Sequence, residues 1–129
     1  MMESRAQENI LECEVNSIQK GSLKNLLIVN LYCGNIGIDF DIIDHINIFH
    51  EKEKVNVILS KDKPRYTSED FCAHGYVVTE IKDKMSPKHK TIISLFGLLV
   101  RIMSEKESIL DLFKINIMDH IYFCVRKVK

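Results

Sequence analysis

This sequence of 129 residues has no net charge and no long apolar segment. Eighteen Lys and Arg residues balance eighteen Asp and Glu residues. A protein whose main partner is nucleic acid is usually visibly basic, so the balance argues against that role, although it is compatible with a local basic patch. The longest apolar stretch, residues 92–103, contains Arg101 and falls short of the about 20 residues that a membrane helix needs. No membrane association is expected.

Clustered cysteines are also absent. The four cysteines are Cys13, Cys33, Cys72 and Cys124, and none lies within four residues of another. This spacing contains no local zinc knuckle. No apolar run follows the first five residues, so no signal peptide is expected. We therefore expect an intracellular protein with reduced, mostly buried thiols.

The sequence offers little to divide it into domains. It has two prolines and five glycines, with no low-complexity segment and no internal repeat. Apolar residues make up 46% of the chain, which is enough for one core, and a chain of this size buries roughly two-thirds of its unfolded surface. We predict a single domain over residues 1–129, with the polar residues 1–8 disordered.

Alternation of apolar and polar residues predicts several strands. It is clearest at residues 36–42 and recurs at 11–15, 55–59 and 121–125, and β-rich runs occupy 26–33 and 71–81. A helix through residues 10–18 fits the first of these segments nearly as well. The Ile42-Ile43 doublet interrupts the alternation and suggests a bulge, after which Ile46 and Ile48 resume it.

Residues 92–103 fit both a helical face and a strand. Gly97 in the middle disfavours a helix by about 1 kcal/mol, and the β-branched content favours a strand. Residues 60–70 and 82–90 read as polar loops, and residues 109–113 as a short helical turn. Short strands joined by polar loops predict an all-β fold, a small antiparallel barrel or sandwich, and the short chain favours the barrel.

No residue pattern points to catalysis, a cofactor or a metal. Asp39 and Asp41 share a strand face, but carboxylates on the outward face of a strand are the ordinary case, and no calcium-loop spacing is present. None of the five histidines lies two or four residues from another, and Cys72 with His74 provides only two ligands. No phosphate-binding or nucleophile-elbow motif occurs. We predict no catalytic residue, no cofactor and no bound metal.

Basic residues near aromatic ones leave a second function open. Lys61, Lys63 and Arg65 precede Tyr66, and further lysines gather in residues 82–90. Basic loops beside aromatics on a small barrel are typical of single-stranded nucleic-acid binding. Acidic residues interleave with these loops, so a mixed solvated surface is the simpler interpretation, and direct nucleic-acid contact is doubtful.

Two C-terminal stretches resemble a known family. Residues 94–102, Ser-Leu-Phe-Gly-Leu-Leu-Val-Arg-Ile, are similar to a signature of the small common subunit, the eighth, of the eukaryotic nuclear RNA polymerases, with Phe96 in place of a glycine. Residues 121–127 resemble that family's closing strand. Upstream, residues 71–77 resemble its aromatic-rich strand with Gly75 at the centre, and the loop at 60–70 is shorter than the acidic loop that family members often carry.

The resemblance implies an oligonucleotide-binding-like barrel of about eight strands. It also implies a non-catalytic structural subunit in the nucleus that docks on the largest subunits of RNA polymerases I, II and III and contacts other polymerase subunits. The alternative is an autonomous single-stranded nucleic-acid-binding barrel. The residues that we assign to a candidate interface are Gly75, Ser94, Gly97, Leu98, Leu99, Arg101, Tyr122 and Arg126.

Within residues 94–102 we predict a strand whose two faces have different roles, one toward the core and one toward a partner. Leu98 and Val100 would share one face, and Gly97, Leu99 and Arg101 the other. Gly97 would let another backbone approach closely. Arg101 would need a carboxylate or carbonyl partner if it is buried, or would end the strand in solvent.

Overall fold

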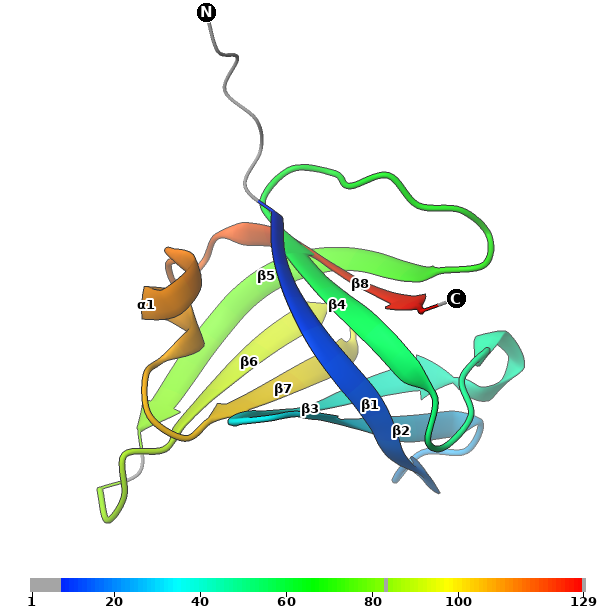
Figure 1. Ribbon diagram of the computed structural model, residues 1–129, viewed down its shortest axis with the longest axis horizontal. Helices are drawn as coiled ribbons and strands as arrows, with labels where there is room; N and C mark the ends of the chain where they lie inside the picture. Colours follow the sequence, from blue (N-terminus) through cyan, green and yellow to red (C-terminus); the bar gives the residue numbers. More distant parts are fainter. Residues whose placement is uncertain (1–7, 83, 129) are drawn as a thin grey trace, which may run out of the picture.

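The computed structural model describes residues 8–82 and 84–128, and its main feature is a closed antiparallel barrel of eight strands (Figure 1). In the order in which they pair around the barrel, the strands are β1 (Glu8–Lys20), β2 (Leu26–Cys33), β3 (Ile36–Ile43), β7 (Leu98–Ser104), β6 (His89–Leu95), β5 (Phe71–Lys82), β8 (His120–Lys127) and β4 (Lys54–Ser60). Pairing of β4 with β1 closes the ring. This confirms the predicted all-β class and is consistent with the oligonucleotide-binding-like barrel.

The interior of the barrel is filled by the apolar residues that alternate along each strand. Phe40, Phe71 and Phe123 meet there, with the Phe40 ring centroid 5.4 Å from that of Phe71 and 5.3 Å from that of Phe123. Phe49 packs edge-on against Phe40 at 6.0 Å. Full burial of large aromatic and branched side chains accounts for most of the stability of such a core.

Two helical segments complete the part of the fold that residues 8–82 and 84–128 form. A 3-10 turn, η1 (Asp44–Ile46), follows β3, and α1 (Ile109–Phe113) lies between β7 and β8 at one end of the barrel (Figure 1). The Ser108 side chain caps α1 by accepting a hydrogen bond from the Leu110 N–H. The helical turn predicted at 109–113 is confirmed. Among the described residues, no helix combines the length and the apolar character needed to cross a membrane.

Several predicted details of the strands need correction. At residues 10–18 the structure has the strand and not the alternative helix. Disorder was expected for residues 1–8, but β1 already begins at Glu8, and residues 1–7 lie outside the described part of the chain. The register of β3 with β2 runs without a bulge through Ile42 and Ile43, and Ile46 ends η1 rather than resuming a strand. The bulges lie instead in β1 at 15–17 and in β5 at 77–79.

Residues 92–103 form a hairpin and not one strand. β6 ends at Leu95, β7 begins at Leu98, and the two residues between them form a tight turn. A single uninterrupted apolar run hides such a turn, because both flanking strands contribute inward apolar residues to the same core.

The expectation of reduced thiols is also wrong, since the structure contains two disulfides, Cys13–Cys33 and Cys72–Cys124. Each bond joins neighbouring strands, with Cα atoms 4.3 Å and 4.0 Å apart. Cys72 and Cys124 are partners in the β5–β8 ladder although 52 residues separate them in sequence. Only the strand pairing brings such distant cysteines together.

Candidate functional site

A row of outward-facing side chains crosses four neighbouring strands. Leu99 on β7 pairs with Ser94 on β6, Ser94 pairs with Tyr76 on β5, and Tyr76 pairs with His120 on β8. Residues beside them in sequence, such as Val100 and Val77, are buried in the barrel. The alternation of a strand therefore turns two residues of the predicted interface, Leu99 and Ser94, outward in one row with Tyr76 and His120.

Aromatic rings cluster at the β5–β8 end of this row. We define the aromatic patch as His74, Tyr76, Phe96, His120 and Tyr122. The His74 ring centroid lies 5.2 Å from that of Phe96 and 5.4 Å from that of Tyr122, and the Tyr76 and His120 centroids are 5.3 Å apart. Aromatic pairs at these separations are mutually attractive.

The patch is accessible to a partner. The exposed fraction is 44% for Tyr76 and 71% for Phe96, which are large values for aromatic side chains. Exposed aromatic clusters are typical of the centres of protein–protein interfaces. His74 and His120 were not among the predicted interface residues, because their proximity arises from strand pairing across 46 residues.

Phe96 is held in the patch by an unusual backbone conformation. Its φ is 55° and that of Gly97 is 108°, so both residues of the β6–β7 turn are left-handed. Two-residue hairpin turns of this kind favour Asn-Gly, and a bulky aromatic at the first position costs free energy. Such strain persists where another constraint maintains it, and it is concentrated at functional sites.

The close approach of two backbones that was predicted at Gly97 occurs at Gly75 instead. No atom lies within 4 Å of the place where a Cβ on Gly97 would be, so Gly97 serves the turn and not a close approach. At Gly75 an added Cβ would lie 1.8 Å from the carbonyl oxygen of Ser94. Gly75 is therefore the residue that lets β5 and β6 come together beneath the aromatic patch.

Arg101 forms an ion pair on the same outer face. Its guanidinium donates to Asp41 Oδ1 at 2.9 Å, and the second carboxylate oxygen of Asp41 accepts from the Leu99 N–H at 2.9 Å. Arg101 is half-buried, so of the two alternatives for this residue the structure selects the carboxylate partner. The predicted separation of faces holds for Leu99 and Arg101, which point outward, and for Leu98 and Val100, which pack against the core.

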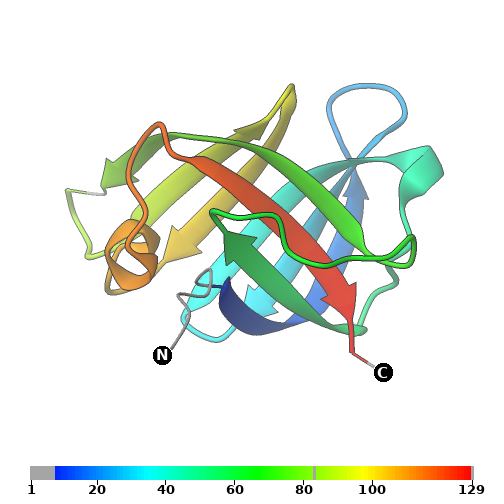
Figure 2. The ribbon, with the colours of Figure 1, turned by 90° about the horizontal axis from the view of Figure 1, so that it is seen from above.

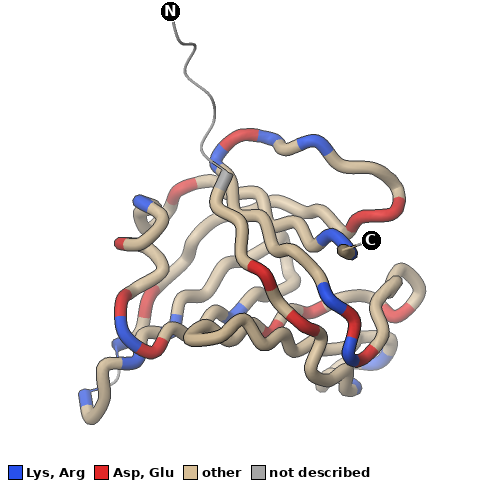
Figure 3. Tube along the Cα trace, in the orientation of Figure 1, with Lys and Arg blue, Asp and Glu red and all other residues tan. Residues whose placement is uncertain are grey.

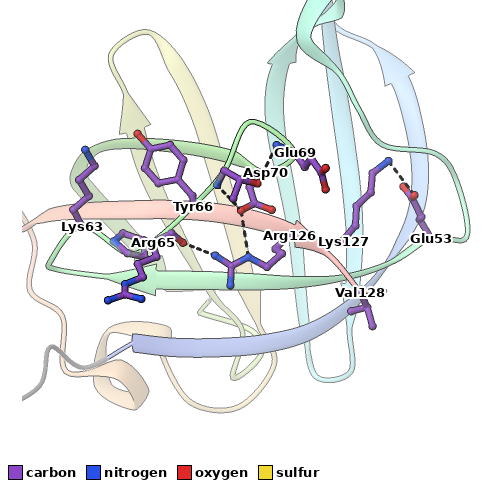
Figure 4. Close-up of a pocket in the computed structure, with 11 residues that line it drawn as sticks. Glu53, Lys63, Arg65, Tyr66, Glu69, Asp70, Arg126, Lys127 and Val128 are labelled. Atoms are coloured by element: carbon purple, nitrogen blue, oxygen red, sulfur yellow. Dashed lines mark hydrogen bonds and ion pairs between the residues drawn. The ribbon is translucent and has the colours of Figure 1, made fainter.

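Arg126, the last predicted interface residue, lies away from the patch and anchors a loop. The loop between β4 and β5 passes over β8 (Figure 2), where Arg126 donates to Asp70 Oδ2 at 3.3 Å and to the Arg65 carbonyl oxygen. Together they line an open groove of about 1230 Å³ (Figure 4). Lys127 on its far side is paired with Glu53 at 3.2 Å. Both β8 cations of this groove are thus already paired within the chain.

Acidic and basic residues are interspersed along the Cα trace (Figure 3). Near the patch, the pKa of Asp119 is lowered, chiefly because the carboxylate accepts a hydrogen bond from the Asn116 N–H and also because Lys61 lies 3.2 Å away. Lys61, one of the basic residues of the 60–70 loop, is consequently engaged as well. In residues 8–82 and 84–128, no group of three or more His, Cys, Asp or Glu side chains is arranged to hold a metal ion.

Comparisons with known proteins identify the class. Residues 9–128 match the model of the RpbG family of DNA-directed RNA polymerase subunits. The chain is 61% identical to DNA-directed RNA polymerase subunit Rpo8 of Saccharolobus solfataricus, over 98% of each chain. It is 60% identical to Rpo8 of Saccharolobus shibatae, again over 98% of each, and 42% identical to Rpo8 of Sulfolobus acidocaldarius, over 89% of this chain and 94% of the other.

The chain is therefore an accessory subunit of a DNA-directed RNA polymerase. It belongs to the RpbG family, whose relatives above carry the name Rpo8. It is a structural subunit, its partners include other polymerase subunits, and the catalytic role of the enzyme lies in those others. The expected identity as the eukaryotic subunit shared by polymerases I, II and III is corrected, because these relatives are archaeal.

Proposed function

We propose that this chain docks on the largest subunit of its RNA polymerase through the aromatic patch and the adjoining outer face of β6 and β7, and that it has no catalytic activity of its own. The nuclear location expected from the eukaryotic resemblance depended on that resemblance alone and is not carried into the proposal.

The observation that carries the proposal is the exposed aromatic patch beside a strained turn. Phe96 is 71% exposed and occupies a left-handed conformation that costs free energy in the isolated chain. Folding alone gives no advantage to an exposed phenylalanine in that position. A partner that buries the ring recovers the cost through the hydrophobic effect.

The face beside the patch suits the same partner. Leu99 and Met103 are 36% and 39% exposed on the outer side of β7, and Val78 on β5 is 43% exposed. Arg101 lies between the two β7 residues with its charge neutralised by Asp41, so docking there does not require desolvation of an unpaired charge. An apolar surface whose arginine is already paired is suited to the apolar centre of a stable interface.

Phe96→Asn separates docking from folding. Asparagine is favoured at this position of the turn, so the variant should be more stable by about 1 kcal/mol, which raises the melting temperature by roughly 4 °C. Loss of a central aromatic anchor should weaken assembly with the largest subunit by about 2 kcal/mol, roughly 30-fold. Thermal melts and a binding titration with the purified largest subunit measure the two effects.

The matched control is Leu23→Asn. Leu23 is 69% exposed, lies in the connection between β1 and β2, and belongs to no part of the proposed face. This variant should leave assembly unchanged. If Phe96→Asn assembles as tightly as the unmodified chain, the patch is not the docking surface.

A further inference from the structure

Two histidine rings within the aromatic patch direct nitrogen atoms at one another. His74 Nδ1 and His120 Nε2 are 2.9 Å apart. His74 is opposite Tyr122 in the β5–β8 ladder and His120 is opposite Tyr76, so the two histidines are diagonal neighbours on the outer surface of an antiparallel pair. Side chains at diagonal positions are within reach of each other only when both lean inward across the pair.

The surroundings hold these rings in place without competing for their nitrogens. His74 contacts the rings of Phe96 and Tyr122, and His120 contacts those of Tyr76 and Tyr122. The carboxylate nearest in sequence, Asp119, is engaged by the Asn116 N–H and by Lys61. Both histidines belong to regular strands, which position side chains more exactly than loops do.

We propose that His74 Nδ1 and His120 Nε2 bind one divalent transition-metal ion of the class that imidazole favours, with Zn²⁺ as the ion tested. Zinc–nitrogen bonds are about 2.0–2.1 Å long, so two nitrogens on a tetrahedral ion lie about 3.3 Å apart. To bind the ion, the observed 2.9 Å separation has to open by about 0.4 Å, and both rings have to turn so that their lone pairs point at the ion instead of along the hydrogen bond.

Replacing the hydrogen bond between the two imidazoles by a metal ion leaves every proton accounted for. Without a metal, one of the two facing nitrogens carries a proton and donates it to the other. On metal binding that proton moves to the remaining nitrogen of the same ring, by way of solvent. Each imidazole then offers a lone pair to the ion.

The site supplies two ligands from this chain, and water completes the coordination. No third His, Cys, Asp or Glu joins them in the described part of the chain. An exchangeable site is therefore expected, weaker than a structural zinc site with four protein ligands. Both ligands belong to one chain, so the isolated chain is sufficient for the test, whereas docking through the aromatic patch would cover the site.

The test is a calorimetric titration of Zn²⁺ into the isolated, chelator-treated chain. We expect one ion per chain, and at least about tenfold weaker binding in His74→Ala and in His120→Ala. His45→Ala, which removes an exposed histidine in η1, is the matched control and should bind as the unmodified chain does.

A second measurement needs no variant. In the unmodified chain, ring resonances of His74 and His120 should shift on zinc addition, while those of His45 and His50 stay in place. The proposal would be overturned by absence of saturable binding, by alanine variants that bind zinc as tightly as the unmodified chain, or by shifts spread over all the histidines. Failure of the docking experiment with Phe96→Asn would leave it intact.

Discussion

Replacing Gly75 by alanine would press a methyl group against the backbone of β6. The new Cβ would lie 1.8 Å from the Ser94 carbonyl oxygen, 2.7 Å from the Ser94 carbonyl carbon and 2.9 Å from the Leu95 Cα. Ordinary contact begins at 3.4 Å, so the Ser94 oxygen has to move by the difference from 1.8 Å, which is 1.6 Å. All three atoms are backbone, and no flexible side-chain end can yield.

The cost follows from what has to move. Overpacking that neighbours can absorb costs about 1–3 kcal/mol. Here the shift also disturbs the Tyr76–Ser94 pairing in the ladder, so we expect a loss of about 3–5 kcal/mol. At this chain length, that corresponds to a fall of roughly 12–20 °C in melting temperature.

Gly37→Ala is the matched control. Gly37 lies in β3, its φ is not positive, and no atom lies within 4 Å of the place where its Cβ would be. The same change of side chain should there be neutral or stabilise by up to about 1 kcal/mol. Urea unfolding of both variants, followed by circular dichroism, gives the comparison. Equal stabilities would refute the assignment of Gly75 to a close approach of β5 and β6.

Three further outcomes are expected. Arg101→Ala should lower the free energy of unfolding of the isolated chain by about 2 kcal/mol, measured with urea, because Asp41 then keeps only its backbone partner. Unchanged stability would show that the ion pair contributes nothing. Asp119 contributes stability that is present above pH 3.8, its ordinary pKa, and is lost as the pH falls through its lowered pKa. In Asp119→Asn, the free energy of unfolding should therefore depend less steeply on pH in that range. An unaltered dependence would contradict this. Single-stranded RNA should bind the isolated chain only weakly at physiological salt, because Lys61 and both β8 cations of the groove are already paired. Fluorescence anisotropy measures the affinity, and a submicromolar value would instead favour an autonomous nucleic-acid binder.

The role of Arg101 depends on a partner that only the tertiary structure reveals. A lone arginine in an apolar run was compatible with an interface or with a solvent-exposed strand end. The ion pair with Asp41, 60 residues away in sequence, makes Arg101 part of the fold itself. Its removal therefore cannot report on docking alone, and Phe96 is the better probe.

Local patterns in the sequence were sufficient to predict the fold class. Period-two alternation marks half-buried strands wherever one face meets a core, so the predicted strands at 36–42, 55–59 and 121–125 lie within β3, β4 and β8. The family resemblance at residues 94–102 and 121–127 correctly indicated an RNA polymerase subunit. It placed the relatives in eukaryotes, because short motifs shared across a family do not distinguish its branches.

The sequence by itself thus determined the fold class, most of the strands and the residues that alternate outward, because these depend on nearest neighbours along the chain, but it did not show the turn between β6 and β7. Tertiary structure alone decided which strands pair, and with them the disulfides, the ion pair of Arg101 and the meeting of His74 with His120. Each of those contacts joins segments at least 20 residues apart. The closure of a barrel sets such contacts through the register of all eight strands at once, which no local pattern encodes.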